Sequence, residues 1–182
     1  MHQDLMDKIA AIIEGKGHRL YGLSAINQRA HALQTAWLAE RDGGDSALIT
    51  AGLLHDIGHM VHDLGEDPAK DGIDDKHELL GQQWLAQWFG PDVTEPVRLH
   101  VAAKRFLCAT ESDYFAKLSP DSVRSLALQG GAMTAAEVAA YRANPYAAAA
   151  TRLRRYDEAA KVKGLETPPV AHFLDHVKAR AK

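Results

Sequence analysis

Helical spacing of the apolar residues constrains the fold of this chain more than any other feature. Apolar positions recur mostly with the period of an amphipathic helix, and β-branched runs are scarce. Thr134 and Glu137 form a T-x-x-E capping box, which is typical of a helix start. Glycine pairs at 43–44 and 130–131 are typical of helix ends. These signals predict an all-α fold, a helical bundle of roughly seven to nine helices.

The remaining start and stop signals give an expected order of elements. The first expected helix runs from a Ser24 cap to about Arg41, and the second starts at Asp45 or Ser46 and breaks near Gly58. A loop is expected over His62–Asp75, followed by a helix that starts at Asp75 and by another that starts after Thr94, with Pro96 in its first turn. The last four expected helices start at Pro120, start after Thr134, cover 144–164 and start at about Val170. No linker separates two cores, and 182 residues can bury a sizeable one. We therefore expect a single domain over residues 1–182.

Composition excludes several classes of function. The net charge of −3 provides no basic surface for nucleic acid or for an anionic membrane. The single cysteine, Cys108, excludes a disulfide framework and favours a reducing compartment. The N-terminal segment is amphipathic and acidic, unlike a signal peptide, and no apolar run is long enough to span a bilayer. We expect a cytoplasmic protein with a small-molecule partner.

The adjacent pair His55 and Asp56, in the stretch LLHDIGH, is not explained by core packing alone. An imidazole nitrogen beside a carboxylate can supply ligands to two neighbouring metal ions. Further donors stand on other predicted helices: His31, His77, His100 and Asp157. Each of these histidines alone would most simply be a hydrogen-bonded core or surface residue. As a set in a helical bundle, where metal sites are built from facing side chains, they predict a dinuclear metal site.

The order of these residues resembles a known signature. Histidine, then His-Asp, then a late aspartate is typical of the HD-domain superfamily, a helical metal-dependent group. His77 and His100 match the two additional histidines of its dinuclear branch. Between about Tyr21 and Lys161 the chain is similar to the oxygenase branch that cleaves carbon–phosphorus bonds, in the stretches AHALQTA, HDIGH, GIDDKHE, HVAAK, LSPDS and RLRRYDEAAK.

The resemblance implies how the metals are held. One iron would be bound by His31, His55, Asp56 and Asp157, and Asp56 would bridge to a second iron bound also by His77 and His100. The second ion has fewer protein ligands and so keeps positions open for substrate and oxygen. The pair would be Fe(II)/Fe(III), with O2 as co-substrate. Zinc and manganese accept the same ligand types, so iron rests on the resemblance alone.

Two cations stand one helical turn from predicted ligands. Lys104 follows His100 by four residues, and Arg154 precedes Asp157 by three, so each pair shares a helix face. A doubly charged phosphonate needs such partners. The resemblance adds His59 and Ser122 to the same pocket and gives His59 and Lys104 catalytic roles. The alternatives are solvated surface cations, a capping role for Ser122, and a role for His59 in orienting a metal ligand.

Tyr21 and Ser24 bear on the choice of substrate. The resemblance implies that Tyr21 occupies an iron position until substrate displaces it, and that Ser24 replaces a glutamate that binds a primary ammonium. Without that carboxylate a quaternary ammonium is favoured, because it donates no hydrogen bonds and suits aromatic faces. Ser24 would otherwise be only a helix cap. The aromatic candidates are Tyr21, Tyr114, Phe115, Tyr141 and Tyr146.

The expected activity is oxidative cleavage of the carbon–phosphorus bond of a 1-hydroxyphosphonate. The favoured substrate is (R)-1-hydroxy-2-(trimethylammonio)ethylphosphonate, giving glycine betaine and phosphate, and the other is 2-amino-1-hydroxyethylphosphonate, giving glycine and phosphate. One alternative keeps the site but hydrolyses a small phosphoester with two metals. A second is a regulatory module with an inactive site. The pair His172 and His176 lies outside the resemblance and is expected at the surface.

Overall fold

The computed structural model describes residues 2–19, 26–61 and 74–182. Within these ranges the secondary structure is ten α-helices, one 3-10 turn and no β-strand, which confirms the all-α prediction. The elements are α1 (His2–Lys16), α2 (Gln28–Arg41), α3 (Ser46–Leu54), α4 (Ile57–Val61), α5 (His77–Leu85), α6 (Pro91–Thr110), η2 (Phe115–Lys117), α7 (Pro120–Leu128), α8 (Ala135–Ala143), α9 (Ala147–Ala159) and α10 (Val170–Arg180).

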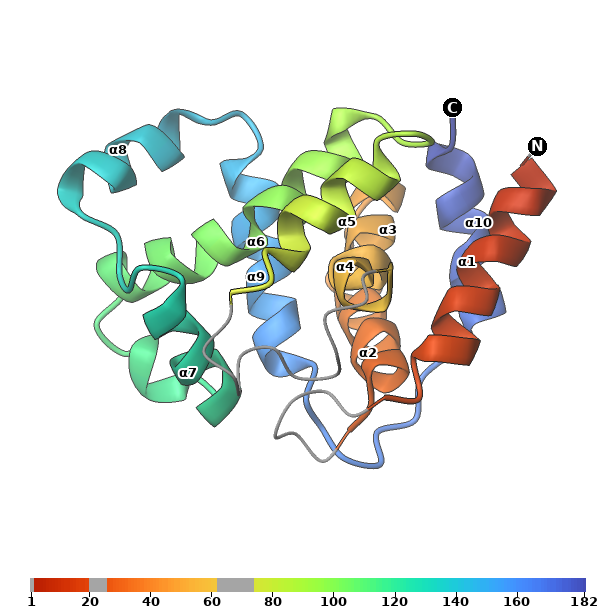
Figure 1. Cartoon of the computed structure of the whole chain (residues 1–182), viewed down its shortest axis with the longest axis horizontal. Helices are drawn as coiled ribbons and strands as arrows, with labels where there is room; N and C mark the ends of the chain where they lie inside the picture. The colour runs from red at the N-terminus through yellow and green to blue at the C-terminus, as the bar shows by residue number, and fades with distance from the viewer. Residues whose placement is uncertain (1, 20–25, 62–73) are drawn as a thin grey trace.

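The long helix α6 crosses the middle of the molecule and contacts α9, α3 and α5 (Figure 1). On one side of it, α2 packs against α3 and α9, and α10 packs against α3 and α1. The segments containing α7 and α8 lie on the other side (Figure 1). Helices α2, α5 and α9 therefore pack against α3 or α6, and the candidate ligands come from these five helices and from the turn after α3.

Helix α3 is the buried centre of the bundle. From Ala47 to Leu54 every residue is buried, so the helix is apolar on all sides and is covered by its neighbours. Gly52 allows the close approach of α2, because a Cβ at that position would lie 3.2 Å from the Cα of Ala36. The close contact between α2 and α3 sets the separation of His31 on one helix from His55 at the end of the other.

Several predicted helix boundaries are confirmed. Asp45 caps α3 by accepting a hydrogen bond from the backbone N–H of Leu48. Thr134 and Glu137 form the reciprocal capping box of α8. Helices α7 and α10 also begin at the predicted residues, Pro120 and Val170.

Several predicted boundaries are wrong, including those of the helix expected over 144–164, which is α9 from Ala147 to Ala159, and the start of α5, which is His77 and not Asp75. Helix α2 begins at Gln28 and is capped by Asn27, which accepts from the N–H of Ala30, rather than by Ser24. The break after α3 falls at residues 55–56 and not near Gly58. Helix α6 begins at position 91, where proline needs no hydrogen-bonded N–H, so Pro96 lies inside the helix rather than in its first turn.

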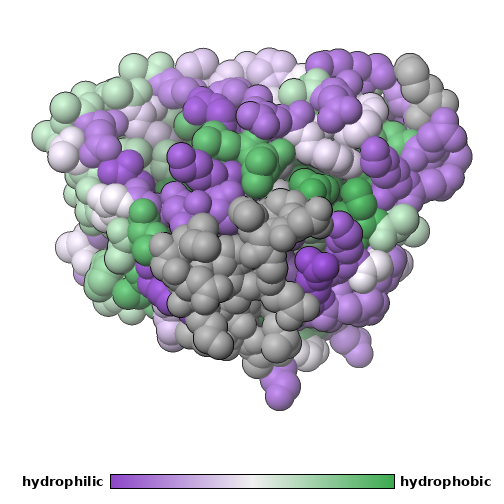
Figure 2. Space-filling view, in the orientation of Figure 1, coloured by the Kyte–Doolittle hydropathy of each residue, from purple (hydrophilic) through white to green (hydrophobic). Residues whose placement is uncertain are grey.

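No helix in the described part of the chain combines the length and apolarity needed to cross a membrane. Figure 2 shows hydrophilic and hydrophobic residues interspersed on the face seen in Figure 1. Such a mixed surface is ordinary for a folded domain, since apolar atoms always supply part of the exposed area.

Candidate metal centre and anion pocket

The six candidate ligands stand on five different parts of the bundle, and all of them are buried. They are His31 in α2, His55 and Asp56 in the turn between α3 and α4, His77 at the start of α5, His100 in α6, and Asp157 in α9. Gly58 brings the turn against α5, because a Cβ there would lie 2.0 Å from the carbonyl oxygen of His77. Only glycine fits this contact, which places His77 beside the His-Asp pair.

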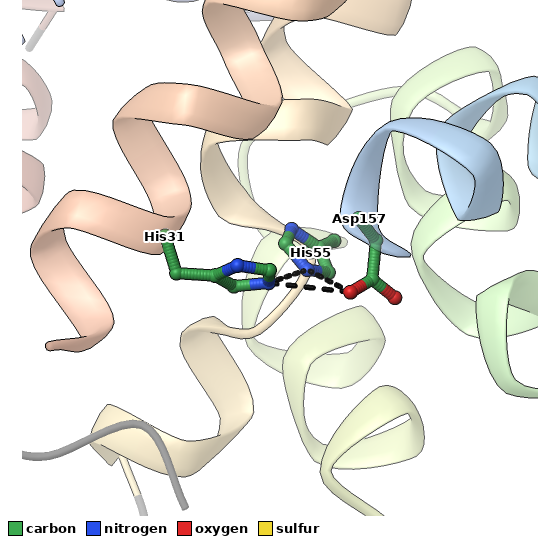
Figure 3. Close-up of side chains that lie close together, drawn as sticks. All are labelled: His31, His55 and Asp157. Carbon is green, nitrogen blue, oxygen red and sulfur yellow. Dashed lines mark hydrogen bonds and ion pairs between the residues drawn. The ribbon is translucent and has the colours of Figure 1, made fainter. Parts of the chain in front are cut away.

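The first cluster consists of His31, His55 and Asp157 (Figure 3). The Nε2 atoms of the two histidines are 3.1 Å apart. Asp157 Oδ1 lies 3.3 Å from Nε2 of His31 and 4.0 Å from Nε2 of His55. Side chains from α2, α9 and the end of α3 therefore point toward one common point.

The second cluster consists of Asp56, His77 and His100. Asp56 Oδ1 lies 3.5 Å from Nε2 of each of these two histidines, whose Nε2 atoms are 3.1 Å apart. The other oxygen, Oδ2, lies 3.4 Å from Nε2 of His55 and 3.6 Å from Nε2 of His31. The two oxygens of one carboxylate thus face the two clusters separately, as a bridging ligand requires.

The hydrogen bonds of the histidines fit a bound cation. In all four rings Nδ1 lies against an oxygen and must carry the proton, which leaves Nε2 as a lone pair. The contacts are His31 to Ala160 O at 2.8 Å, His55 to Gly52 O at 2.9 Å, His77 to Asp75 Oδ1 at 2.9 Å and His100 to Val97 O at 2.7 Å. Two Nε2 lone pairs 3.1 Å apart repel one another, and either a bound metal ion or a proton on one of the two nitrogens removes that repulsion.

Two carboxylate oxygens lead to the same conclusion. Asp56 Oδ2 and Asp157 Oδ1 are buried, and no hydrogen-bond partner satisfies them within the described residues. A buried charged oxygen without a donor is costly, and a metal ion would satisfy it. With nitrogen and carboxylate donors together, both clusters suit a first-row transition metal.

The charges around the clusters shift the ionisation of the ligands. Burial, helped by the nearby His77, lowers the pKa of His100 to about 3. Burial also opposes protonation of His77, but its hydrogen bond to Asp75 and the charge of Asp56 outweigh this effect and raise its pKa to about 9. Burial raises the pKa of Asp157, but the Arg154 guanidinium more than offsets it and holds that pKa well below its usual range. His100 is therefore a neutral ligand at physiological pH, and Asp157 is a charged one.

Lys104 is a buried cation with a neutral partner. Its side chain is 3% exposed, and its ammonium donates to Ser125 Oγ at 2.7 Å. Burial and the positive charge of Arg154 lower the pKa of Lys104 to about 7. A buried ammonium that contacts a hydroxyl instead of a carboxylate is well placed to receive an anion.

Arg154 links the first candidate metal cluster to a group of buried polar side chains. Its guanidinium forms ion pairs with Asp157 and Glu158, and it donates to Tyr114 Oη and to Ser122 Oγ at 3.0 Å each. Ser122 lies in the first turn of α7 and is buried. The structure thus brings Arg154 and Ser122 together, as predicted, and places both beside a candidate metal ligand.

Two residues that contact Ser122, Lys161 and Glu158, were not predicted from the sequence. Lys161 donates to Ser122 Oγ at 3.1 Å and to Glu158 Oε2 at 3.1 Å, and Glu158 accepts from Ser122 Oγ at 2.8 Å. The signal was present, because charged residues at 154, 157, 158 and 161 share the three- and four-residue spacing of one helix face.

His59 lies beside the second cluster. Its Nδ1 is 2.7 Å from Asp75 Oδ2, and its ring stacks on His77 with the ring centroids 4.0 Å apart. The sequence analysis left open whether His59 contacts substrate or orients a ligand, and this position suits both roles. Asp75, which it expected only as a helix start, is a further residue that sequence reasoning missed.

Some predicted residues lie elsewhere or cannot be placed. Tyr21 and Ser24 lie outside the described residues. Tyr141 is buried, and its hydroxyl donates to Ala147 O, which makes it a core residue of the packing between α6, α8 and α9. His172 and His176 are partly exposed and both contact Glu40, as expected for a surface pair.

Comparison with known proteins identifies the class. The HD-domain family model matches residues 29–149, which contain five of the six candidate ligands, and Asp157 follows this segment. The chain is 44% identical over 169 residues to a hydroxymethylphosphonate dioxygenase of Gimesia maris, covering 92% of this chain and 84% of that protein. It is 40% identical over 174 residues to a glycine-betaine-forming 1-hydroxy-2-(trimethylamino)ethylphosphonate dioxygenase of Leisingera caerulea, covering 96% of this chain and 89% of that protein.

The chain therefore belongs to the HD-domain family and, within it, to the branch that contains these phosphonate dioxygenases. Both relatives are aligned over nearly the whole chain, so the likeness includes the region of the anion pocket as well as the His-Asp pair. The predicted resemblance is confirmed.

Proposed function

We propose that this protein cleaves the carbon–phosphorus bond of a 1-hydroxyphosphonate with two iron ions and O2. The balanced reaction is R–CH(OH)–PO3²⁻ + O2 → R–COO⁻ + HPO4²⁻ + H⁺. The C–P bond and the C1–H bond break, O2 accepts four electrons, and its two atoms account for the added oxygens of carboxylate and phosphate. The names of both relatives, each a dioxygenase of a hydroxyphosphonate, support this reaction.

The protein side chains would hold the metals as two unequal sets. One ion would be bound by His31, His55, Asp157 and one oxygen of Asp56. The other would be bound by His77, His100 and the second oxygen of Asp56, a smaller set that leaves room for substrate. Iron bound there would supply the redox chemistry with O2, for which the side chains themselves have no capacity.

The observation that carries the assignment of an anionic substrate is a buried lysine, Lys104, which contacts a hydroxyl and no carboxylate among the residues that the structure describes. Lys104 lies one helical turn from His100, and Arg154 lies one turn from Asp157, so both cations stand next to the metal centre. A phosphonate dianion would compensate the Lys104 charge and accept a hydrogen bond from Lys161, and the Ser122 hydroxyl, which now donates to Glu158, would turn to donate to it. These residues would hold the phosphorus end fixed while C1 faces the metals.

Three substrates are consistent with the relatives and the sequence. Hydroxymethylphosphonate has no ammonium group, and the trimethylammonio compound has one that cannot donate hydrogen bonds. Ser24 provides no carboxylate for the primary ammonium of 2-amino-1-hydroxyethylphosphonate. We expect turnover of the first two compounds to exceed turnover of the third, because an unpaired primary ammonium is costly to desolvate.

Aerobic turnover with an oxygen electrode tests the proposal. Iron-loaded protein is mixed with each of the three hydroxyphosphonates, and oxygen uptake and released phosphate are measured together. We expect one O2 consumed for each phosphate. Phosphate release from a phosphoester without oxygen uptake would instead identify a two-metal hydrolase, and failure with all three hydroxyphosphonates would refute the substrate class.

The proposal also concerns the setting of the protein. A single cysteine in the sequence supports a reducing compartment, the cytoplasm. The net charge of −3 supports a small-molecule partner rather than nucleic acid.

A further inference from the structure

The four histidines of the metal centre differ in what holds their outer nitrogen. For His31, His55 and His100 the partner of Nδ1 is a backbone carbonyl. For His77 it is the carboxylate of Asp75, at 2.9 Å. A carboxylate orients a ligand ring as a carbonyl does, and it also makes the metal-facing nitrogen a stronger donor.

Asp75 is fixed by more than this one bond. Its Oδ1 also accepts the backbone N–H of His77 at 3.2 Å, and its Oδ2 lies 2.7 Å from Nδ1 of His59. The side chain is 8% exposed. One carboxylate therefore holds two imidazole rings, which stack on one another, and Nε2 of His77 faces the candidate metal centre.

The backbone between Asp75 and His77 is strained in a way that maintains this arrangement. Lys76, the residue between them, has φ of 48°, in the left-handed region that non-glycine residues rarely adopt. This conformation folds the chain so that the Asp75 side chain reaches both the backbone and the ring of His77. Such strain persists only where surrounding contacts stabilise it, and it is common at functional sites.

We propose that Asp75 is a positioning residue that strengthens the second metal position through His77 and fixes His59 for contact with substrate. The inference rests on the proposed two-metal function. The second position has fewer protein ligands than the first, so its affinity depends more on the donor strength of each ligand. The bond to His59 keeps the proton on Nδ1 of that ring and fixes the ring plane over His77.

Metal titration of Asp75→Asn tests the inference, with Asp74→Asn as the matched control. Asp74 is one residue away and loses the same charge, and its carboxylate lies 3.4 Å from the backbone nitrogen of Lys76. Anaerobic Fe(II) titration by calorimetry should give two sites in the parent and in the control. In Asp75→Asn the weaker site should lose roughly 10- to 100-fold in affinity, while the tighter site stays within about threefold.

The tighter site also reports folding, because an unfolded variant would lose both sites. If Asp75→Asn does not fold, Asp75→Glu keeps the carboxylate and should weaken only the second site. His59→Ala should leave both metal affinities unchanged and raise KM for the hydroxyphosphonate. A parent that binds only one ion would refute the proposed two-metal centre, whereas equal affinities in parent and Asp75→Asn would overturn only the role of Asp75.

Discussion

The two metal clusters share one carboxylate but are built differently. The first cluster draws His31, His55 and Asp157 from the middle of the bundle, where their exposed fractions are 2% or less. The second includes His77, at the first turn of a helix, with 8% exposure and a partly exposed His59 stacked on it. The Nδ1 atom of His77 contacts the carboxylate of Asp75, next to the strained residue Lys76, whereas the Nδ1 atoms of the two histidines in the first cluster contact backbone carbonyls. A deep cluster held by regular helices suits firm metal binding, and a shallower one suits access by substrate.

The bridging role proposed for Asp56 gives the largest expected effect. Asp56→Ala should reduce bound metal from two ions per chain to less than one, because each cluster loses an oxygen ligand. A bound metal stabilises the transition state by several kcal/mol, so its loss should lower kcat by roughly three or more orders of magnitude. Metal analysis of the purified variant checks this, with the exposed Asp42→Ala as a control. Two ions retained in Asp56→Ala would show that the clusters do not share this ligand.

Removing one histidine from each cluster should separate the two positions. His31→Ala should lose the first ion and His100→Ala the second, so each variant should bind about one ion where the parent binds two. Because the first cluster has more ligands and lies deeper, His100→Ala should bind its remaining ion more tightly than His31→Ala does. Calorimetric titration measures both affinities, and identical behaviour of the two variants would mean that the clusters are equivalent.

The pH dependence of kcat/KM should be the smallest effect. It comes from Lys104, which lies in α6 together with His100 of the second cluster. The ammonium of Lys104, whose charged neighbours are Arg154, Asp157, Lys161 and Glu158, has a pKa of about 7. Below that pH Lys104 is charged and, in the proposed function, would bind phosphonate, whereas above it the charge is lost. We therefore expect kcat/KM to fall as pH rises from 7 to 9, by at most about tenfold per unit.

Lys104→Arg is the matched variant for this measurement, because arginine stays charged across the range while ionisation of the substrate itself is unchanged. The ratio of parent to variant kcat/KM should therefore decline above pH 7. A constant ratio from pH 6 to 9 would assign the titration to the substrate and remove Lys104 from phosphonate binding.

The sequence was informative where local chemistry decides the outcome. The helical period and the caps at Asp45 and Thr134 predicted the fold class and several boundaries. They failed at the start of α2, where Asn27 rather than Ser24 supplies the cap, because both are good capping residues and tertiary contacts choose between them. They also failed at the start of α6. Pro91 and Pro96 are both candidates for the first turn, and the helix begins at Pro91, where the missing N–H needs no partner.

The candidate site was predictable in part. The six ligand positions followed from residue types together with a resemblance, and the structure brings their side chains together. Asp75, Glu158 and Lys161 act through contacts with other side chains, and no single spacing identifies such residues. The orientation of the two Asp56 oxygens, one toward each cluster, depends on the packing of five helices. The spacing of residues in the sequence cannot predict it.

The contact between Arg154 and Asp157 has a consequence for the order of events. One oxygen of Asp157 faces His31, and the other is held by the guanidinium that also reaches Ser122. In the proposed function, binding of the first metal ion and binding of the substrate would thus depend on a single carboxylate. We expect the metal-free protein to bind phosphonate poorly, so that the metal ion must bind before the substrate does.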